Sequence, residues 1–383
     1  MTVKAVLTAD NHLNKHYRTM RPDQLEKRRA ILSRNFDETV DTAIRERVDL
    51  YLHAGDLFDM PSPKNQPLIR VAQRLRELYD EGIRAYMIAG THDMPKMRGA
   101  SGGAPPQRIF QAQGHAKFFS ETDTIETQKV IIDGLEVVVG GISVDPTLED
   151  QDPLEGKAFG ESGDINILLV HYGIESHVSY RSRDPVISRK TITELGADLI
   201  CSGHIHDNRI FRIGETTVVI PGATERMGFG EREKTPGFYL LDIGRDGVDA
   251  EFIKSDCQPM SELKVNVDDL YGDPNEVLID MIRNQSSEDT LLKLNLQGTV
   301  PRSLYHRLKL HKLFVLGNEL NFNFTIDDSL ILESFTEDFE GGRLSQKEEI
   351  RSISDMIMKD KSEFEKDIIR SARDLVLKMY DND

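Results

Sequence analysis

The stretch VKAVLTADNH, residues 3–12, runs from an apolar segment into an aspartate and a histidine. Residues 3–8 are rich in apolar and β-branched side chains, which predicts a buried strand that ends just before Asp10. The end of a strand delivers the side chains that follow it to one edge of a sheet, where they can face a ligand. Because residues two apart in an extended chain point the same way, Asp10 and His12 can enter one pocket.

Four similar motifs follow along the chain. They are GDLFD at residues 55–59, GTHD at 90–93, a histidine at position 171 after LLV, and GHIH at 203–206. His204 and His206 repeat the two-residue spacing of the first motif. A single such motif would be weak evidence, but five in order, four of them after apolar runs, indicate that one sheet edge gathers these side chains.

The residue types in these motifs point to metal-assisted chemistry. Carboxylate oxygens and neutral imidazole nitrogens hold Mn, Fe or Zn as divalent ions. Asp56 follows the apolar run 49–54, where one carboxylate could bridge two ions. Two ions roughly 3.5–4 Å apart can activate a water and stabilise both the attacking and the leaving oxygen of a phosphate ester. The motifs therefore predict a two-metal phosphoesterase site.

The remaining histidines have a simpler interpretation. The chain has 11 histidines, and a lone histidine is more often structural or on the surface than a ligand. We assign that role to His53, His115, His177, His306 and His311. His16 is expected on the surface, although its place just after the first motif keeps a functional role open.

The constellation resembles the calcineurin-like metallophosphoesterase superfamily and, within it, the SbcD-type nuclease subunit of the double-strand-break repair complex. The resemblance is good over residues 1–255 and weaker over 260–335. Three features favour this branch over small-molecule phosphatases. They are Leu13 after the first motif with a long charged helix behind it, PGATER at 221–226 with FGE at 229–231, and the additional C-terminal residues.

The resemblance also implies roles for individual residues. It assigns one ion to Asp10, His12, Asp56 and His206, and a second ion, both most plausibly Mn, to Asp56, Thr91, His171 and His204. It further implies that His92 is the catalytic histidine that contacts the phosphate and protonates the leaving group. Asp93 is expected to orient His92 through a hydrogen bond.

Two positions depart from the family pattern. Thr91 stands where the family has asparagine, and a hydroxyl is shorter and a poorer neutral ligand than an amide carbonyl, so a water could fill the gap. This difference puts the affinity of the second ion in question. Asp59 lies where related nucleases often have a histidine. It could repel the substrate phosphate, supply a further ligand, or simply cap a loop, and the sequence leaves these alternatives open.

Length and composition fit an enzyme of two to three domains. The chain has 383 residues, two cysteines far apart and no apolar run long enough to span a membrane. A strand is expected almost from the first residue, so we expect no signal peptide. The scarcity of cysteine suits a reducing compartment. We therefore expect a cytoplasmic protein, associated with the nucleoid if its source is prokaryotic or viral.

The net charge of −17 argues only superficially against a nucleic-acid partner, because the local field at a site decides binding. Basic residues recur in the loops that follow the metal motifs, and the strand ends would bring these loops together. The candidate DNA contacts are Lys15, Arg18, Lys96, Arg98, Arg181, Arg183 and Arg226. The alternative interpretation is ordinary solvated loop charge.

Alternation of strand and helix patterns, followed by hairpins, predicts a two-sheet α/β sandwich of metallophosphoesterase type. Residues 1–257 are the expected nuclease domain. Residues 260–335 show a β-α-β-α-β pattern, with helices at 275–284 and 302–310, which the resemblance interprets as a small α+β capping domain that helps grip DNA. Residues 343–383, after Gly341-Gly342, form the expected helical segment.

Apolar residues from Ile350 through Phe364 to Met379 approximate one helical stripe, while the other faces are charged in both signs. Such a stripe either docks on a partner or packs on its own chain. The resemblance implies docking on the coiled coil of an SMC-like ATPase, and a homodimer is a further possible assembly. The two interpretations of the stripe stay open at this point.

These observations predict a Mn-dependent DNA exonuclease and endonuclease of SbcD type that hydrolyses backbone phosphodiesters. A small-molecule phosphodiesterase is a second hypothesis, which the extra domain and the loop charges disfavour. A DNA-binding subunit with weak nuclease activity is a third, and Thr91 makes it plausible. A nuclease assay beside a generic phosphodiester separates the three.

Overall fold

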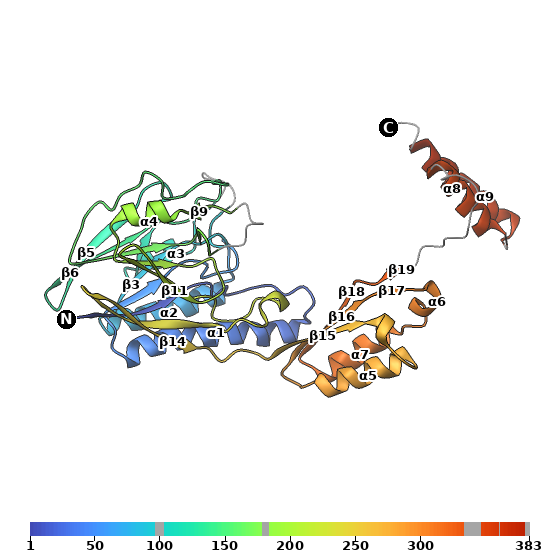
Figure 1. The fold of residues 1–383 in the computed structure, drawn as a ribbon, viewed down its shortest axis with the longest axis horizontal. Helices are drawn as coiled ribbons and strands as arrows, with labels where there is room; N and C mark the ends of the chain where they lie inside the picture. Colours follow the sequence, from blue (N-terminus) through green and yellow to red (C-terminus); the bar gives the residue numbers. More distant parts are fainter. Residues whose placement is uncertain (96–102, 178–183, 333–345, 360, 380–383) are drawn as a thin grey trace. The chain divides into compact units, whose positions relative to one another are not determined.

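The computed structural model describes residues 1–95, 103–177, 184–332, 346–359 and 361–379 (Figure 1). These residues form two compact units. The larger comprises Met1–Gly298 and His306–Leu330, and the smaller comprises Thr299–Tyr305 and Ile331–Asp383.

The first large sheet is built around the strand that starts the chain. Its six strands lie in the order β14-β13-β1-β2-β3-β4, with β1 to β4 parallel and the β13–β14 hairpin antiparallel to β1. The strands span Val3–Thr8 (β1), Leu50–His53 (β2), Arg84–Ile88 (β3), Lys117–Phe119 (β4), Gly237–Gly244 (β13) and Gly247–Lys254 (β14).

The second large sheet also has four neighbouring parallel strands, but here one antiparallel strand lies at each edge. Its order is β11-β12-β10-β7-β6-β5. The strands span Glu126–Ile132 (β5), Leu135–Gly141 (β6), Ile165–Val170 (β7), Leu199–Ser202 (β10), Arg209–Ile213 (β11) and Thr216–Ile220 (β12).

The two sheets pack face to face over a dry core. Leu7 and Leu52 from the first sheet meet Val139, Leu169 and Cys201 from the second, and all five side chains are fully buried. Alternate residues of the same strands point outward, where helices cover them. This arrangement confirms the predicted two-sheet α/β sandwich.

Helices cover the outer face of each sheet (Figure 1). Helices α1, Pro22–Arg45, and α2, Asn65–Asp80, pack on the first sheet through buried side chains such as Phe36 and Leu75. On the second sheet, α4, Arg189–Leu195, contributes Ile192. The short helix α3 and the two-residue strands β8 and β9 complete this part of the chain, at Gln107–Ala112, Gly173–Ile174 and Val186–Ile187.

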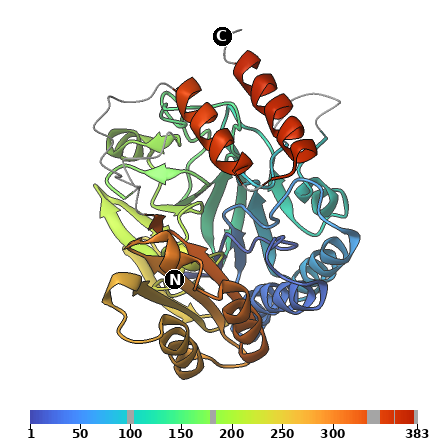
Figure 2. The same ribbon diagram turned by 90° about the vertical axis from the view of Figure 1, so that its right-hand side faces the viewer.

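A small three-stranded parallel sheet follows, with α5 and α7 side by side on one of its faces (Figure 2). Its elements are β15 (Met260–Asn266), α5 (Pro274–Gln285), β16 (Leu291–Gln297), α7 (Leu310–Leu320) and β18 (Asn323–Asp328). Leu292, Leu294 and Phe324 are buried and point to the helix side of the sheet. The opposite face carries Lys293 and Thr325, which are only partly buried.

The predicted helix at 302–310 is wrong. The structure has a single turn, α6, at Arg302–Tyr305 and places the longer helix α7 at Leu310–Leu320. Gly317 lies inside α7, although glycine is a poor helix former. In the fold Gly317 is buried, and a side chain there would collide with the Phe324 ring. The glycine therefore serves close packing of α7 on β18, which only the tertiary structure reveals.

The smaller unit contains the two-stranded pair β17–β19 and a helical hairpin. Its elements are β17 (Thr299–Val300), α6, β19 (Ile331–Leu332), α8 (Gln346–Met358) and α9 (Glu363–Met379). Arg373 Nη1 of α9 lies 3.5 Å from Asp355 Oδ1 of α8. Ile357, Ile368 and Leu375 are exposed. Gly341-Gly342 and the side chains of Phe364 and Met379 lie outside the described residues.

Over the described residues, the structure contains no helix with the length and apolar character needed to cross a bilayer.

A buried ion pair ties α1 to the loop after β12. Arg28 and Glu225 are both fully buried, with Arg28 Nη1 2.9 Å from Glu225 Oε2. Arg28 also donates to the carbonyl of Arg226 and to Gln258 Oε1, at 2.6 and 3.1 Å. Glu225 accepts from the backbone N–H groups of Arg226 and Gln258. Since nearly every polar atom has a partner, both charges are well compensated.

Replacing Arg28 with methionine should lower the free energy of unfolding by about 3–5 kcal/mol, because Glu225 would stay buried without a countercharge. Urea unfolding followed by circular dichroism measures this loss. The matched control is Arg34→Met, which breaks the exposed pair with Asp256 and should cost below about 1 kcal/mol. Equal losses in the two variants would contradict a structural role for the buried pair.

Candidate metal centre

The five motifs meet at one edge of the sandwich, beyond the carboxyl ends of parallel strands. β1 ends two residues before Asp10, β2 three before Asp56, and β3 four before His92. β7 ends directly before His171, and β10 ends two residues before His204. Because parallel strands end at the same edge, side chains from positions 10 to 206 become neighbours.

The backbone at this edge is unusual. Asp10, His12, Asp56 and His204 have left-handed φ angles of 52°, 46°, 52° and 77°. L-residues rarely adopt this conformation, and such strain concentrates at functional sites. Alternation along a strand, the predicted reason why Asp10 and His12 face one site, is therefore wrong. Asp10 and His12 lie in a loop, and the left-handed turns, not an extended chain, set the directions of their side chains.

Three motif glycines make room for the polar side chains. A β-carbon at Gly55 would lie 2.5 Å from His171 Nδ1, and one at Gly90 would collide with the Asp56 carboxylate. A β-carbon at Gly203 would collide with the Ala54 carbonyl. The glycines in GDLFD, GTHD and GHIH are therefore needed for close approach of these loops.

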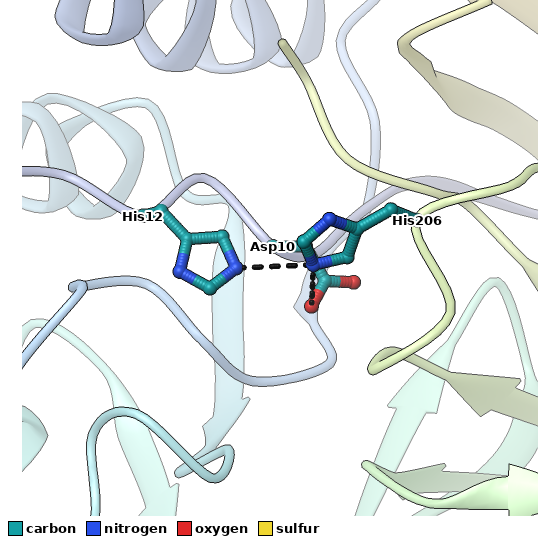
Figure 3. A group of neighbouring side chains, drawn as sticks. All are labelled: Asp10, His12 and His206. Atoms are coloured by element: carbon teal, nitrogen blue, oxygen red, sulfur yellow. Dashed lines mark hydrogen bonds and ion pairs between the residues drawn. The ribbon is translucent and has the colours of Figure 1, made fainter. Parts of the chain in front are cut away.

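Asp10, His12 and His206 converge on one point (Figure 3). The Nε2 atoms of His12 and His206 are 3.1 Å apart, and His206 Nε2 is 3.7 Å from Asp10 Oδ1. Two nitrogens each about 2.1 Å from one ion, at right angles, would lie about 3 Å apart. The geometry of this group therefore fits a divalent cation.

A second group, Asp10, Asp56 and His171, is completely buried. His171 Nε2 lies 3.3 Å from Asp56 Oδ2 and 3.9 Å from Asp10 Oδ1, while its Nδ1 donates to the Ala54 carbonyl at 2.7 Å. Among the described residues, His171 Nε2 has no hydrogen-bond partner although it is buried. A buried imidazole nitrogen beside two carboxylates fits a metal ligand.

The two buried carboxylates at this edge also favour the binding of a cation. Asp10 and Asp56 are 0% and 2% exposed, and a buried carboxylate is costly unless it is paired or binds a metal. Burial alone would raise the pKa of Asp56, but His171 and His12 outweigh it and hold the pKa below its ordinary value. Burial likewise disfavours a charged His171, yet Asp56 and Asp10 raise its pKa to about 9.

Each of the three candidate histidine ligands has an acceptor close to its Nδ1 atom. His206 Nδ1 is 2.7 Å from Glu231 Oε1, and His12 Nδ1 is 3.2 Å from Asp59 Oδ1. The Ala54 carbonyl is the acceptor for His171 Nδ1, at 2.7 Å. The hydrogen bonds at His206 and His171 turn Nε2 toward the site and fix the tautomer that binds a metal, whereas the contact at His12 is a close approach without hydrogen-bond geometry. Asp59 is thus placed against His12 and also pairs with Lys15 Nζ at 2.7 Å, more than a loop cap requires.

Glu231 was missed as a site residue at the sequence level. It was noted only as part of FGE at 229–231, and its neighbour in space, His206, is 25 residues away. The one signal available along the sequence was the acidic residue shortly after PGATER. His53 has the structural role expected, since its Nε2 is 2.7 Å from Asn11 Oδ1 and burial lowers its pKa to about 3.

His92 lies at the mouth of the site and is half exposed, with its ring 4.7 Å from that of His12, centroid to centroid. Its backbone N–H donates to Asp56 Oδ1 at 2.7 Å, and its Nδ1 is 3.3 Å from the Asp59 carbonyl. It also joins His12 and Asp56 in a third group able to hold a cation. This position suits a residue that contacts substrate.

Asp93 does not orient the His92 ring as expected. Its carboxylate accepts from the backbone N–H groups of Leu57, Phe58 and Gly90, at 2.9–3.2 Å. Burial, together with the neighbouring Asp56, raises the pKa of Asp93 to about 7. Asp93 therefore joins the loop of Asp56 to the loop of His92, and its effect on His92 passes through the backbone.

His204 lies outside the three groups of possible ligands, and Thr91 is exposed. The backbone N–H of His204 donates to both carboxylate oxygens of Asp10, while its Nε2 lies 3.6 Å from Asp184 Oδ2. Its ring is 5.5 Å from that of His171, so it borders the second group without joining it.

The expected DNA contacts are unevenly placed. Arg18 is exposed, whereas Lys15 is paired with Asp59 beside the site. Arg226 is held by the carbonyls of Lys234 and Gln258. Lys96, Arg98, Arg181 and Arg183 lie outside the described residues.

Comparisons with known proteins bear on this site. The family model for calcineurin-like phosphoesterases matches residues 3–208. The DNA double-strand break repair protein Mre11 of Sulfolobus acidocaldarius is 26% identical over 302 residues, 76% of this chain and 74% of that protein. Its counterpart in Saccharolobus solfataricus is 28% identical over 75% of this chain and 72% of that protein. A dimetal phosphatase from Danio rerio aligns with 65% of this chain and 98% of its own, at a TM-score of 0.39 and 12% identity.

Replacing Glu231 with alanine should weaken Mn²⁺ binding by about 10–100-fold, because the His206 ring would lose the contact that orients it. Isothermal titration with Mn²⁺ measures the affinity. The control is Glu233→Ala, an exposed glutamate two residues away, which should bind Mn²⁺ like the unaltered chain. If Glu231→Ala also binds Mn²⁺ normally, Glu231 does not hold His206 for a metal.

Proposed function

This chain belongs to the calcineurin-like phosphoesterase family, and from that membership and the geometry of the site we propose that it is a two-metal DNA nuclease. It is a phosphoesterase whose candidate ligands suit divalent metals. The finer statement, hydrolysis of backbone phosphodiesters at broken DNA ends with Mn²⁺, is our proposal. The observation that carries it is the convergence of Asp10, Asp56, His12, His171 and His206 on one strand-end edge.

Asp10, His12 and His206 would hold the first ion, and Asp56 and His171 would hold the second, with Asp10 common to both groups. His171 would complete the inner site, with His204 and Thr91 at its border. When bound, two such ions supply an activated water and neutralise the charge that develops on the phosphate. The left-handed loop at Asp10 and the acceptors behind each imidazole keep these side chains in place.

His92 has the remaining chemical role. It is half exposed, so a phosphate at the site can reach its ring, and the Asp56 contact to its backbone fixes the loop that carries it. A protonated imidazole there would donate its proton to the sugar oxygen that departs. We propose Lys15, beside Asp59, and the exposed Arg18 as contacts to flanking phosphates.

DNA as the substrate rests on the relatives. The archaeal proteins that match about three quarters of this chain are named for DNA double-strand break repair. The match extends beyond the catalytic sandwich of residues 1–257, so we assign residues 260–335 to a DNA-capping domain. A small-molecule phosphodiesterase would not need that domain. The exposed Thr91 supports a second candidate, a DNA-binding subunit in which the inner ion is weak and cleavage is slow.

Changing His92 to glutamine should leave the metal content unaltered and slow Mn²⁺-dependent cleavage of DNA by about a hundredfold or more, in the range of a general acid. Cleavage of single- and double-stranded oligonucleotides is followed on gels, with metals counted by elemental analysis. The control is His115→Gln, far along the chain from the motifs. Unchanged turnover would remove His92 from the mechanism, and loss of metal would make it a ligand. Hydrolysis of a chromogenic phosphodiester without DNA cleavage would refute the nuclease.

We further propose that residues 343–383 dock on the coiled coil of an SMC-like ATPase. Helices α8 and α9 pack on each other, yet Ile353, Met356, Ile357, Ile368 and Leu375 remain exposed. Exposed apolar rows of this kind mark interaction sites. Charged residues elsewhere on the hairpin would set the orientation of the partner.

Leu375→Asp should abolish co-purification with the SMC-like ATPase of the source organism while leaving the melting temperature and DNA cleavage unaltered. A charge in the middle of an apolar contact is costly to desolvate, whereas on a free surface it is tolerated. Ser371→Asp introduces the same charge on the same helix and should still bind. A Leu375→Asp protein that binds the ATPase normally, or that melts far below the unaltered chain, would favour packing of the hairpin on its own protein.

A further inference from the structure

A groove of about 410 Å³ lies between the small sheet and two loops of the sandwich. Met20 and Tyr17 from the loop after the first motif line one part, and Met227 and Phe229 from the loop after PGATER line another. Met260 of β15 lines the sheet side. Its size falls in the range of about 300–1,000 Å³ typical of sites for small planar molecules.

The floor of the groove is the face of the small sheet that lies opposite α5 and α7. Leu291 and Lys293 of β16 pair with Asn323 and Thr325 of β18, and these alternate residues share one face. The opposite face packs on α5 and α7. The groove thus combines apolar walls with a floor that carries the Thr325 hydroxyl, which is able to bond the polar edge of a heterocycle, whereas the Asn323 amide is buried and donates to the Thr19 carbonyl at 3.3 Å.

The charge of the groove disfavours a phosphate. Lys293 Nζ is 2.7 Å from Asp327 Oδ2 and 3.7 Å from Glu262 Oε1, so its charge is already compensated. Asp327 and Asp328 both line the groove, against the single cation of Lys293. A neutral aromatic ligand fits this lining better than an anion.

One short loop links the groove to the candidate metal centre. Phe229 and Glu231 lie on one 3₁₀ turn, Phe229–Glu231, and Met227 donates its backbone N–H to Glu231 Oε2 at 2.7 Å. The other oxygen of Glu231 contacts His206. Tyr17 lies five residues after His12, and its hydroxyl is 3.9 Å from Met227 Sδ. A ligand in the groove is therefore next to a molecule held at the metals.

We propose that this groove receives one unstacked nucleobase of a single DNA strand whose backbone phosphate lies at the metal centre. The proposal rests on the proposed nuclease function and names the form of DNA that the site takes. An aromatic ring and thioether sulfurs stack on any base, so the groove would prefer single-stranded or frayed ends without reading sequence. A base inside an intact duplex has both faces covered and cannot enter.

The test measures binding of 5′-labelled single-stranded oligonucleotides by fluorescence anisotropy, with one abasic site moved along the strand. The full chain carries His92→Gln, so that bound DNA stays intact while Mn²⁺ is present. An abasic site at one or two adjacent positions should weaken binding about tenfold, in the range of one stacking contact. Phe229→Ala should weaken binding of the intact strand to a similar extent and abolish the dependence on that position.

Three further variants make the result specific. Phe229→Tyr keeps an aromatic ring and should keep the dependence on position, whereas Phe229→Leu keeps most of the apolar volume and should lose it. Phe229→Leu also covers the case in which the alanine variant fails to fold. Phe314→Ala removes a half-exposed ring on α7, outside the groove, and should behave like the parent chain.

The proposal is overturned if no abasic position weakens binding, or if Phe229→Ala and Phe229→Leu keep the full dependence. The first outcome is also expected if an apolar segment of a protein partner occupies the groove. Cleavage is scored separately on chains with His92 intact. Cleavage without any dependence on an abasic position refutes the groove alone, whereas position dependence without cleavage refutes the nuclease and leaves the groove in place.

Discussion

The structure depends on the burial of two carboxylates, Asp10 and Asp56, among imidazoles at the edge of a β-sandwich. Two negative charges removed from water in one place are unstable without compensation. Several features around the two carboxylates are related to this need for compensation. The left-handed loops turn the carboxylates inward, the motif glycines let the loops approach, and Glu231, Asp59 and the Ala54 carbonyl lie behind the imidazoles. A divalent cation completes the arrangement electrostatically, which is why the ligand set and the strain occur together.

Such strain needs a rigid support, and the sandwich provides it. Each large sheet contributes parallel strands whose carboxyl ends lie at one edge, and the two sheets share a dry core. Asp93 adds a second restraint, because its buried carboxylate joins the loops of Asp56 and His92 through three backbone N–H groups. The ligands are thus held by the framework before any ion or substrate arrives. Preorganisation of this kind favours rapid chemistry over adaptable binding.

The loop from Pro221 to Glu231 connects the metal centre to the small sheet domain. At one end Glu225 is paired with Arg28 and with the backbone of Gln258, which leads into β15. At the other end Glu231 contacts His206. A displacement of the small domain would therefore reach His206, a candidate metal ligand, through this one loop. The groove beside Phe229 lies on this same connection, so occupancy of the groove and geometry at the metals are physically linked.

By itself, the sequence determined the two-sheet fold, the strand ends and the residues that gather there, because apolar periodicity and the Asp/His motifs are local signals. It could not predict that α7 runs through Gly317, since the glycine is explained only by the Phe324 ring packed against it. Nor could it assign Asp93 to backbone N–H groups or Glu231 to His206, because those partners are brought together by the fold. The residue types fixed the chemistry available to the site. The tertiary structure decided which atoms face each other, since hydrogen bonds and ion pairs depend on distances in space that spacing along the chain does not set.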